Sequence, residues 1–226
     1  MRKHAFLLLF ALSGAAILAG CAKKDAGAPG TGTPTVDTDA YAGWKTITAK
    51  SGSFSLKFPP EYVSGAEADE ASKKGMEEVA KTHPDLAASV NAAQANSQID
   101  LYAIDLSKES VSDGFADNVN VIVETWAPSG DVAELLKKTG EETIKTMPSS
   151  TPMVGEMIEI GNIPVFKYTG SMEFPGANGS KLTSDLTGFL IPHDGKVLIV
   201  SMSTKTGDKD KAAANFEKIA RSITFN

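Results

Sequence analysis

The chain has 226 residues and carries 22 lysines and arginines against 28 aspartates and glutamates, which gives a net charge of −6 at neutral pH. Domains that bind nucleic acid display a basic stripe or patch. The acidic balance therefore argues against a nucleic-acid partner, and equally against direct docking of the protein surface on anionic lipid. The single cysteine, Cys21, excludes an internal disulfide.

The first twenty residues have the pattern of a secretory signal peptide. Arg2 and Lys3 form a basic start, and residues 5–19 are almost unbroken apolar. This apolar run is shorter than the roughly 20 residues that a transmembrane helix needs. We therefore predict that residues 1–20 are a signal peptide. Their removal takes away two basic residues and no acidic residue, which leaves 20 basic against 28 acidic residues and a net charge of −8.

The tetrad Leu18-Ala19-Gly20-Cys21 resembles the lipobox of bacterial lipoproteins. The resemblance implies that the chain is cut before Cys21, that the Cys21 thiol is acylated (palmitate), and that the protein is anchored in a membrane of the cell envelope by this lipid. An ordinary signal peptide followed by an incidental cysteine is the alternative. Since Ala22 and not aspartate follows the cysteine, the resemblance implies the outer membrane facing the periplasm in a Gram-negative host, and the cell surface otherwise.

Residues 21–43 are predicted to be a flexible tether. The segment consists largely of alanine, glycine, threonine, proline, lysine and aspartate, which bury too little apolar surface to offset the entropy of the chain. As a random coil of about 20 residues, it has a mean end-to-end distance of roughly 25 Å. Residues 44–226 then form a single domain.

A hairpin is predicted at the start of this domain. Residues 53–58 alternate in polarity and place three large apolar side chains on one face: Phe54, Leu56 and Phe58. Trp44–Thr48 is the expected partner strand, across a turn at Ser51-Gly52, and Pro59-Pro60 ends the hairpin.

Residues 64–97 are predicted to be a helical insertion. Acidic residues precede lysines by four positions on one side of it: Asp69 and Lys73, Glu70 and Lys74, Glu77 and Lys81. Its apolar stripe is thin: Ala71, Gly75, Met76, Val79, Leu86 and Val90. The pattern fits a solvated helical pair lying over the sheet, or a lid or partner-binding arm that detaches.

Two further strands and a helix follow. Residues 98–105 predict a strand whose inward side chains are Ile99, Leu101 and Ala103. Residues 118–125 predict a strand with Val119, Val121 and Val123 on one face. Asp131 is then expected to cap a helix, with Glu134 in the third position of a capping box.

The remainder predicts a meander of strands over 152–203, a helix over about 208–222 and a last strand at Ile223–Phe225. Two-residue hairpin turns are expected at Gly161-Asn162 and Asp194-Gly195, and a longer loop at Pro175–Gly179. The last helix has a buried stripe of Ala212, Phe216, Ile219 and Ala220. The order of elements predicts an α+β fold, an antiparallel β-sheet flanked by helices.

Three stretches resemble landmarks of the PsbP-like group: residues 51–63, 113–125 and 215–225. The resemblance implies an α/β/α sandwich with helices on both faces of the sheet, and it carries over no catalytic residue. Two features depart from the group's pattern. The proline turn continues with Glu61-Tyr62-Val63 instead of Gly-Trp, and the insertion at 64–97 is unusually long.

No stretch predicts a catalytic residue, a metal site or a cofactor. His83 and His193 are the histidines that remain after processing, and they are far apart in the sequence. The HExxH, CxxC and GxSxG patterns are absent. Lys205-Thr206-Gly207 matches a motif of penicillin-binding enzymes, but the Ser-x-x-Lys motif that carries their nucleophile is absent from the chain. Asp208 and Asp210 have the spacing of a calcium-binding loop, but the glycine at its sixth position and the glutamate at its twelfth are missing.

Two functions are left open. The first is a non-enzymatic module that binds or helps to assemble another envelope protein while Cys21 holds it at the membrane. The alternative is a small-solute-binding lipoprotein, in which the ligand lies between the insertion and the sheet.

Overall fold

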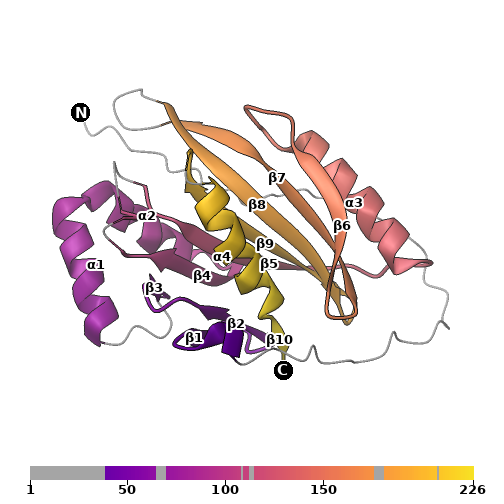
Figure 1. The fold of residues 1–226 in the computed structure, drawn as a ribbon, viewed down its shortest axis with the longest axis horizontal. Coiled ribbons are helices and arrows are strands. Elements are labelled where there is room, and N and C mark those ends of the chain that lie inside the picture. The colour runs from indigo at the N-terminus through magenta and orange to yellow at the C-terminus, as the bar shows by residue number, and fades with distance from the viewer. Residues whose placement is uncertain (1–38, 65–69, 108, 112–114, 176–180, 208) are drawn as a thin grey trace.

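The computed structural model describes residues 39–64, 70–107, 109–111, 115–175, 181–207 and 209–226. The predicted signal peptide, the lipobox with Cys21 and the tether up to residue 38 lie outside these ranges. The described residues form a seven-stranded sheet, a three-stranded sheet and flanking helices (Figure 1). All neighbouring strands are antiparallel. The predicted α+β class is therefore confirmed.

The three-stranded sheet has the order β1-β2-β10, from β1 (Lys45–Thr48), β2 (Phe54–Phe58) and β10 (Thr224–Phe225). The predicted hairpin is confirmed, and its turn closes with the amide of Gly52, at a φ of +72°, donating to the carbonyl of Ala49. A 3-10 helix, Asp39–Tyr41, precedes it. Tyr41 is buried, and its hydroxyl donates to the carbonyl of Lys218 at 2.9 Å. Residues 39–43, predicted as the end of the tether, thus belong to the folded part.

The large sheet has the order β3-β4-β5-β9-β8-β7-β6. Its strands, in chain order, are β3 (Tyr62–Val63), β4 (Ile99–Asp105), β5 (Asn118–Thr125), β6 (Val154–Ile160), β7 (Ile163–Pro175), β8 (Lys181–His193) and β9 (Lys196–Lys205). The turns at Gly161-Asn162 and Asp194-Gly195 are confirmed, with positive φ angles at Gly161, Asp194 and Gly195. Residues 176–180 of the longer predicted loop are outside the described ranges.

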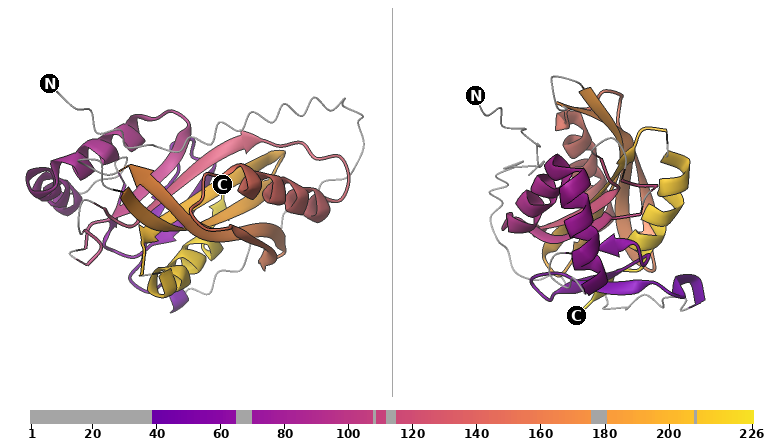
Figure 2. Two further views of the ribbon diagram at one scale, coloured as in Figure 1. Left: turned by 90° about the horizontal axis from the view of Figure 1, so that it is seen from above. Right: turned by 90° about the vertical axis from the view of Figure 1, so that its left-hand side faces the viewer.

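Helices cover both faces of this sheet, as Figure 2 shows. Helix α3 (Val132–Thr146) lies over one face and α4 (Lys209–Arg221) over the other. The predicted cap of α3 is confirmed, since the Asp131 carboxylate accepts a hydrogen bond from the amide of Glu134 at 2.9 Å. We call the two buried clusters the α3-side core, which includes Leu136, Phe166 and Ile122, and the α4-side core, which includes Phe216, Val121 and Leu56.

The prediction that Ile99 shares a face with Leu101 and Ala103 is wrong. The pairing of β4 with β5 shifts register between Ile99 and Leu101, so that Ile99 joins the α3-side core while the other two join the α4-side core. The intervening Asp100 explains the shift. Its carboxylate accepts hydrogen bonds from the amide and the hydroxyl of Ser51, in the turn of the small sheet, at 2.8 and 2.6 Å.

The insertion contains α1 (Glu70–Thr82) and α2 (Pro84–Ala95), which pack at the β3-β4 end of the large sheet. Val79, Leu86 and Val90 are buried there against Val63 and Ile104. The Nζ atom of Lys50 donates to the carbonyls of Gln94, Asn96 and Ile99 at 2.9–3.3 Å, and so fastens the end of α2 to the small sheet. The insertion is therefore the helical pair lying over the sheet that the sequence offered as one interpretation.

Candidate functional site

A cleft of about 490 Å³ is lined by residues of the turn after β2, of β3, of the end of β4 and of helix α4. The chain enters it at Pro59, which ends β2, and turns there, because the amide of Tyr62 donates to the carbonyl of Pro59 at 3.2 Å. Strand β3 then pairs with the end of β4 and sets Tyr62 opposite Asp105. The cleft is thus formed at the junction of the two sheets.

Four carboxylates line the cleft: Glu61, Asp105, Glu109 and Asp117. Asp105 accepts a hydrogen bond from the amide of Ser107 at 2.7 Å, and Asp117 accepts one from the hydroxyl of Thr204 at 2.9 Å. Glu61 and Glu109 are exposed at the rim. Within the described part of the chain, no lysine or arginine forms an ion pair with Glu61, Asp105 or Glu109. The cleft therefore concentrates negative charge, and no basic side chain that the structure describes forms an ion pair at these three positions.

Burial raises the pKa of the Asp105 carboxyl, and the charges of Glu61 and Glu109 raise it further, while the hydrogen bonds from Ser107 lower it. Because the folded state raises this pKa, it binds the proton more tightly than the unfolded state does. Ionised Asp105 thus costs stability at neutral pH, and the cost disappears as the pH falls through the range in which the folded carboxyl becomes protonated.

We expect Asp105→Asn to raise the melting temperature at neutral pH. The amide oxygen of asparagine still accepts from the amide of Ser107, while the charge is gone. Thermal melts between neutral and acidic pH test this, and the advantage of the variant should shrink as the pH falls. Glu141→Gln, which removes an exposed carboxylate of α3, is the control and should change little. A variant less stable than wild type at neutral pH would contradict the prediction.

Tyr62 is the buried polar group of the cleft. The residue is 3% exposed, and its ring packs against that of Phe58 with centroids 5.5 Å apart. Burial raises the pKa of the phenol, and Asp117, Asp105 and Glu61 raise it further by their negative charge, so the hydroxyl keeps its proton and lies among the carboxylates. In the described ranges, this hydroxyl has no hydrogen-bond partner. A hydroxyl at a cleft wall without a partner among the described residues is available to a ligand.

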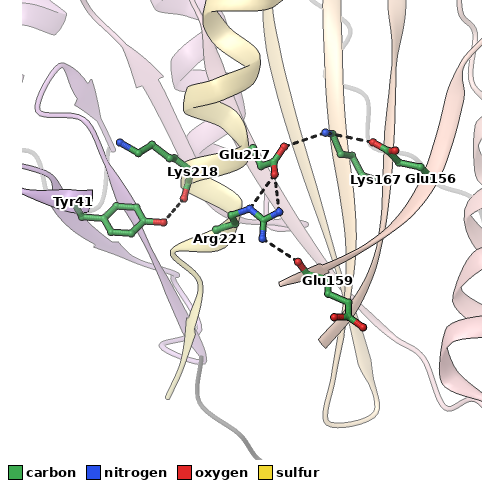
Figure 3. Close-up of polar contacts among 7 residues, drawn as sticks. All are labelled: Tyr41, Glu156, Glu159, Lys167, Glu217, Lys218 and Arg221. Atoms are coloured by element: carbon green, nitrogen blue, oxygen red, sulfur yellow. Dashed lines mark hydrogen bonds and ion pairs between the residues drawn. The ribbon is translucent and has the colours of Figure 1, made fainter. Parts of the chain in front are cut away.

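A second charged cluster joins α4 to β6 and β7 (Figure 3). Glu217 accepts hydrogen bonds from Arg221, at 2.7 and 3.0 Å, and from Lys167 at 3.1 Å, and these lower the pKa of its carboxyl. Lys167 also pairs with Glu156 at 3.5 Å, and Arg221 donates to the carbonyl of Glu159. The charges of Glu217, Lys167 and Arg221 thus pair with one another, so the cluster fastens α4 to the sheet and differs from the cleft.

The structure does not bring the histidines together. His83 lies between α1 and α2, whereas His193 ends β8 and stacks on the ring of Phe225, with centroids 3.6 Å apart. Burial lowers the pKa of His193. The described residues contain no group of three or more histidines, cysteines, aspartates or glutamates that could hold a metal ion. Among them there is also no helix long and apolar enough to cross a membrane.

The sequence prediction assigned none of the cleft residues to a functional site. Glu61, Asp105 and Asp117 are scattered along the chain, and the pairing of β3 with β4, together with the loop that leads into β5, gathers them. One signal was present, because Glu61-Tyr62 stands where the PsbP-like pattern has Gly-Trp. Cys21, the predicted lipidation site, lies outside the described residues.

No family model matches this chain, and no curated protein matches it. Among solved structures, it is similar to cyanobacterial PsbP (CyanoP) from Synechocystis sp. PCC 6803, with 11% identity and a TM-score of 0.48 over 89% of this chain and 98% of that one. It is also similar to LpqN, involved in cell envelope biogenesis of Mycobacterium tuberculosis, with 12% identity and a TM-score of 0.46 over 86% and 99% of the two chains.

A third similar structure is a protein of Bacteroides thetaiotaomicron, with 9% identity and a TM-score of 0.46 over 81% of this chain. The match spans about half of that protein, 49% of its chain. At these identities and scores, the similarities say nothing about function.

Proposed function

We propose that this protein is a lipid-anchored module of the bacterial cell envelope that binds another envelope protein and catalyses no reaction. The observation that carries the proposal is the acidic cleft at the junction of the two sheets. It combines three carboxylates, those of Glu61, Asp105 and Glu109, that pair with no basic side chain among the described residues, with the hydroxyl of Tyr62, and this is the chemistry of a binding site for a positively charged group.

A binding role is favoured over catalysis by the residues that line the cleft. They supply negative charge, hydroxyls and apolar contact, and no histidine, lysine or cysteine is among them. A carboxyl group with a raised pKa is often a general acid. General acid catalysis by Asp105 would still need a partner group to attack or stabilise the substrate. The cleft offers none beyond further carboxylates and hydroxyls.

Binding of a small solute is the second candidate, and the size of the cleft favours it. A volume of about 490 Å³ falls within the range of small-molecule sites, roughly 300–1,000 Å³. Such sites are mostly apolar with few polar groups, whereas this cleft has four carboxylates. The balance of charge thus favours a site that recognises the surface of a protein partner.

Photo-crosslinking in intact cells tests the proposal. A photoreactive residue replaces Asn215, which is exposed on α4 and lines the cleft, and the matched control replaces Lys137, which is exposed on α3 over the opposite face. The Asn215 position should capture one discrete envelope protein and the Lys137 position should not. Free monomer alone from both positions would overturn the proposed protein partner in favour of the small-solute candidate.

The anchor is tested separately. Cys21→Ser should release the protein from the membrane fraction or leave the chain unprocessed, because the lipidated cysteine is the proposed attachment to the membrane. Fractionation of cells and palmitate labelling measure this. Palmitate that is still incorporated into the Cys21→Ser chain would contradict lipidation at this cysteine.

A further inference from the structure

We infer that the cleft receives the side chain of an arginine or lysine from the partner protein, held by Glu61 and Asp105 and by the hydroxyl of Tyr62. This inference rests on the proposed function and names the chemistry by which the partner is recognised. The relevant groups converge from the turn after β2, from β3 and from the end of β4.

The first argument is electrostatic. Asp105 is half-buried, and Glu61 and Glu109 lie at the rim of the same cleft without a basic partner among the described residues. Like charges held together in a partly desolvated site repel one another, and a cation placed between them relieves this repulsion. The mutual repulsion is already visible in the pKa of Asp105, which Glu61 and Glu109 both raise.

The second argument is the hydroxyl of Tyr62, which is independent of the carboxylates. A hydroxyl that forms no hydrogen bond inside the protein is free to form one with a ligand. Tyr62 is 3% exposed and lines the cleft, and its hydroxyl has no partner in the described part of the protein. An N–H group of a guanidinium or ammonium donates to this oxygen and also to the neighbouring carboxylates.

The third argument is shape. Pro59, Ala212 and Phe216 give the cleft apolar walls between the carboxylates. Arginine and lysine side chains have an aliphatic stem that packs on apolar surface and a charged head that stays with polar groups. A bare metal ion would use only oxygen ligands, and the described residues hold no set of three acidic or histidine ligands close enough for one. The mixed lining therefore fits an organic cation.

The same chemistry occurs in a free polyamine, and the test separates the two sources. The full chain, purified in detergent, is titrated with a fluorescent peptide that carries three arginines spaced by glycines, and spermidine and calcium serve as competitors. We expect the peptide to bind, the affinity to fall with rising salt, and both competitors to displace it only in large excess.

Two variants connect the binding to the cleft. Tyr62→Phe should weaken peptide binding about tenfold, the effect of losing one hydrogen bond to a charged group. Its melting temperature should be unchanged or higher, because the lost hydroxyl has no partner in the free protein. Asp105→Asn should weaken binding as well, whereas Glu141→Gln on α3 should bind like wild type.

Each of the following results would overturn the inference: no binding of the peptide, wild-type affinity in Tyr62→Phe, displacement by calcium at equimolar concentration, or binding of spermidine without binding of the peptide. The last result would assign the cleft to a free polyamine. A protein captured from Asn215 in cells together with no peptide binding would overturn this inference and leave the proposed function standing.

Discussion

Replacement of Val121 by aspartate should prevent folding. Val121 is fully buried at the centre of the large sheet, between Leu101 of β4 and Val200 of β9, and it belongs to the α4-side core. An aspartate there would be an unpaired carboxylate in an apolar environment. Its cost of several kcal/mol approaches the entire stability of a typical domain, about 5–15 kcal/mol. Circular dichroism during thermal melting of the purified variant measures the result.

Two neighbouring substitutions provide the controls. Ile122 points to the opposite face and is 8% exposed in the α3-side core, so Ile122→Asp should destabilise nearly as much. Asn120 is half-buried and already polar, so Asn120→Asp should be mild. If Val121→Asp melted cooperatively near the wild-type temperature, the register of β5 and the placement of the α4-side core would both be wrong.

Gly140→Ala is expected to have the second largest effect, a loss of several kcal/mol. Gly140 lies in α3, where alanine is intrinsically better than glycine by about 1 kcal/mol. However, a Cβ atom on Gly140 would overlap three carbon atoms of the Phe166 ring, far inside van der Waals contact. The ring cannot retreat, because Gly155 of β6 packs against it just as closely. Overpacking therefore outweighs the gain in helix propensity.

The same substitution in another helix is the matched control. A Cβ atom on Gly75 of α1 would meet only the Cδ1 atom of Leu106, at 3.1 Å, and the end of a leucine side chain moves easily. Gly75→Ala should thus be neutral or stabilising by up to about 1 kcal/mol. Chemical denaturation of both variants gives the two free energies of unfolding. A Gly140→Ala chain as stable as Gly75→Ala would contradict the close packing of α3 on Phe166.

Local patterns predicted the strands and turns well, because alternation and turn residues act within a few positions. The β5 prediction is an example, since Val119 and Val121 point into one core and Ile122 into the other. The face on which Ile99 lies was not predicted, because a hydrogen-bonded contact between Asp100 and the distant Ser51 shifts the register of the strand there. The division into two sheets was not predicted either, because it depends on a pairing between residues far apart in the sequence, Thr224 and Ser55.

The cleft could not be predicted from local patterns. Glu61 lies far before the other three carboxylates in the sequence, and each of the four alone is an ordinary polar residue near a strand. Tyr62 would be assigned to the core by its neighbours, since it packs on Phe58. Only the pairing of β3 with β4 and the position of α4 show that this tyrosine lies among acidic groups. The Glu61-Tyr62 departure from the PsbP-like pattern marked the place without indicating its chemistry.

Crosslinking from Asn215 in cells that produce the Glu61→Gln, Asp105→Asn double variant tests the central claim most directly. If the partner docks on the acidic cleft, the product captured by the wild-type chain should be lost, while the Glu141→Gln chain should still give it at full yield. The amount of each chain in the membrane fraction, measured in the same cells, should be equal. Capture of the same partner by the double variant at wild-type yield would contradict docking at the cleft.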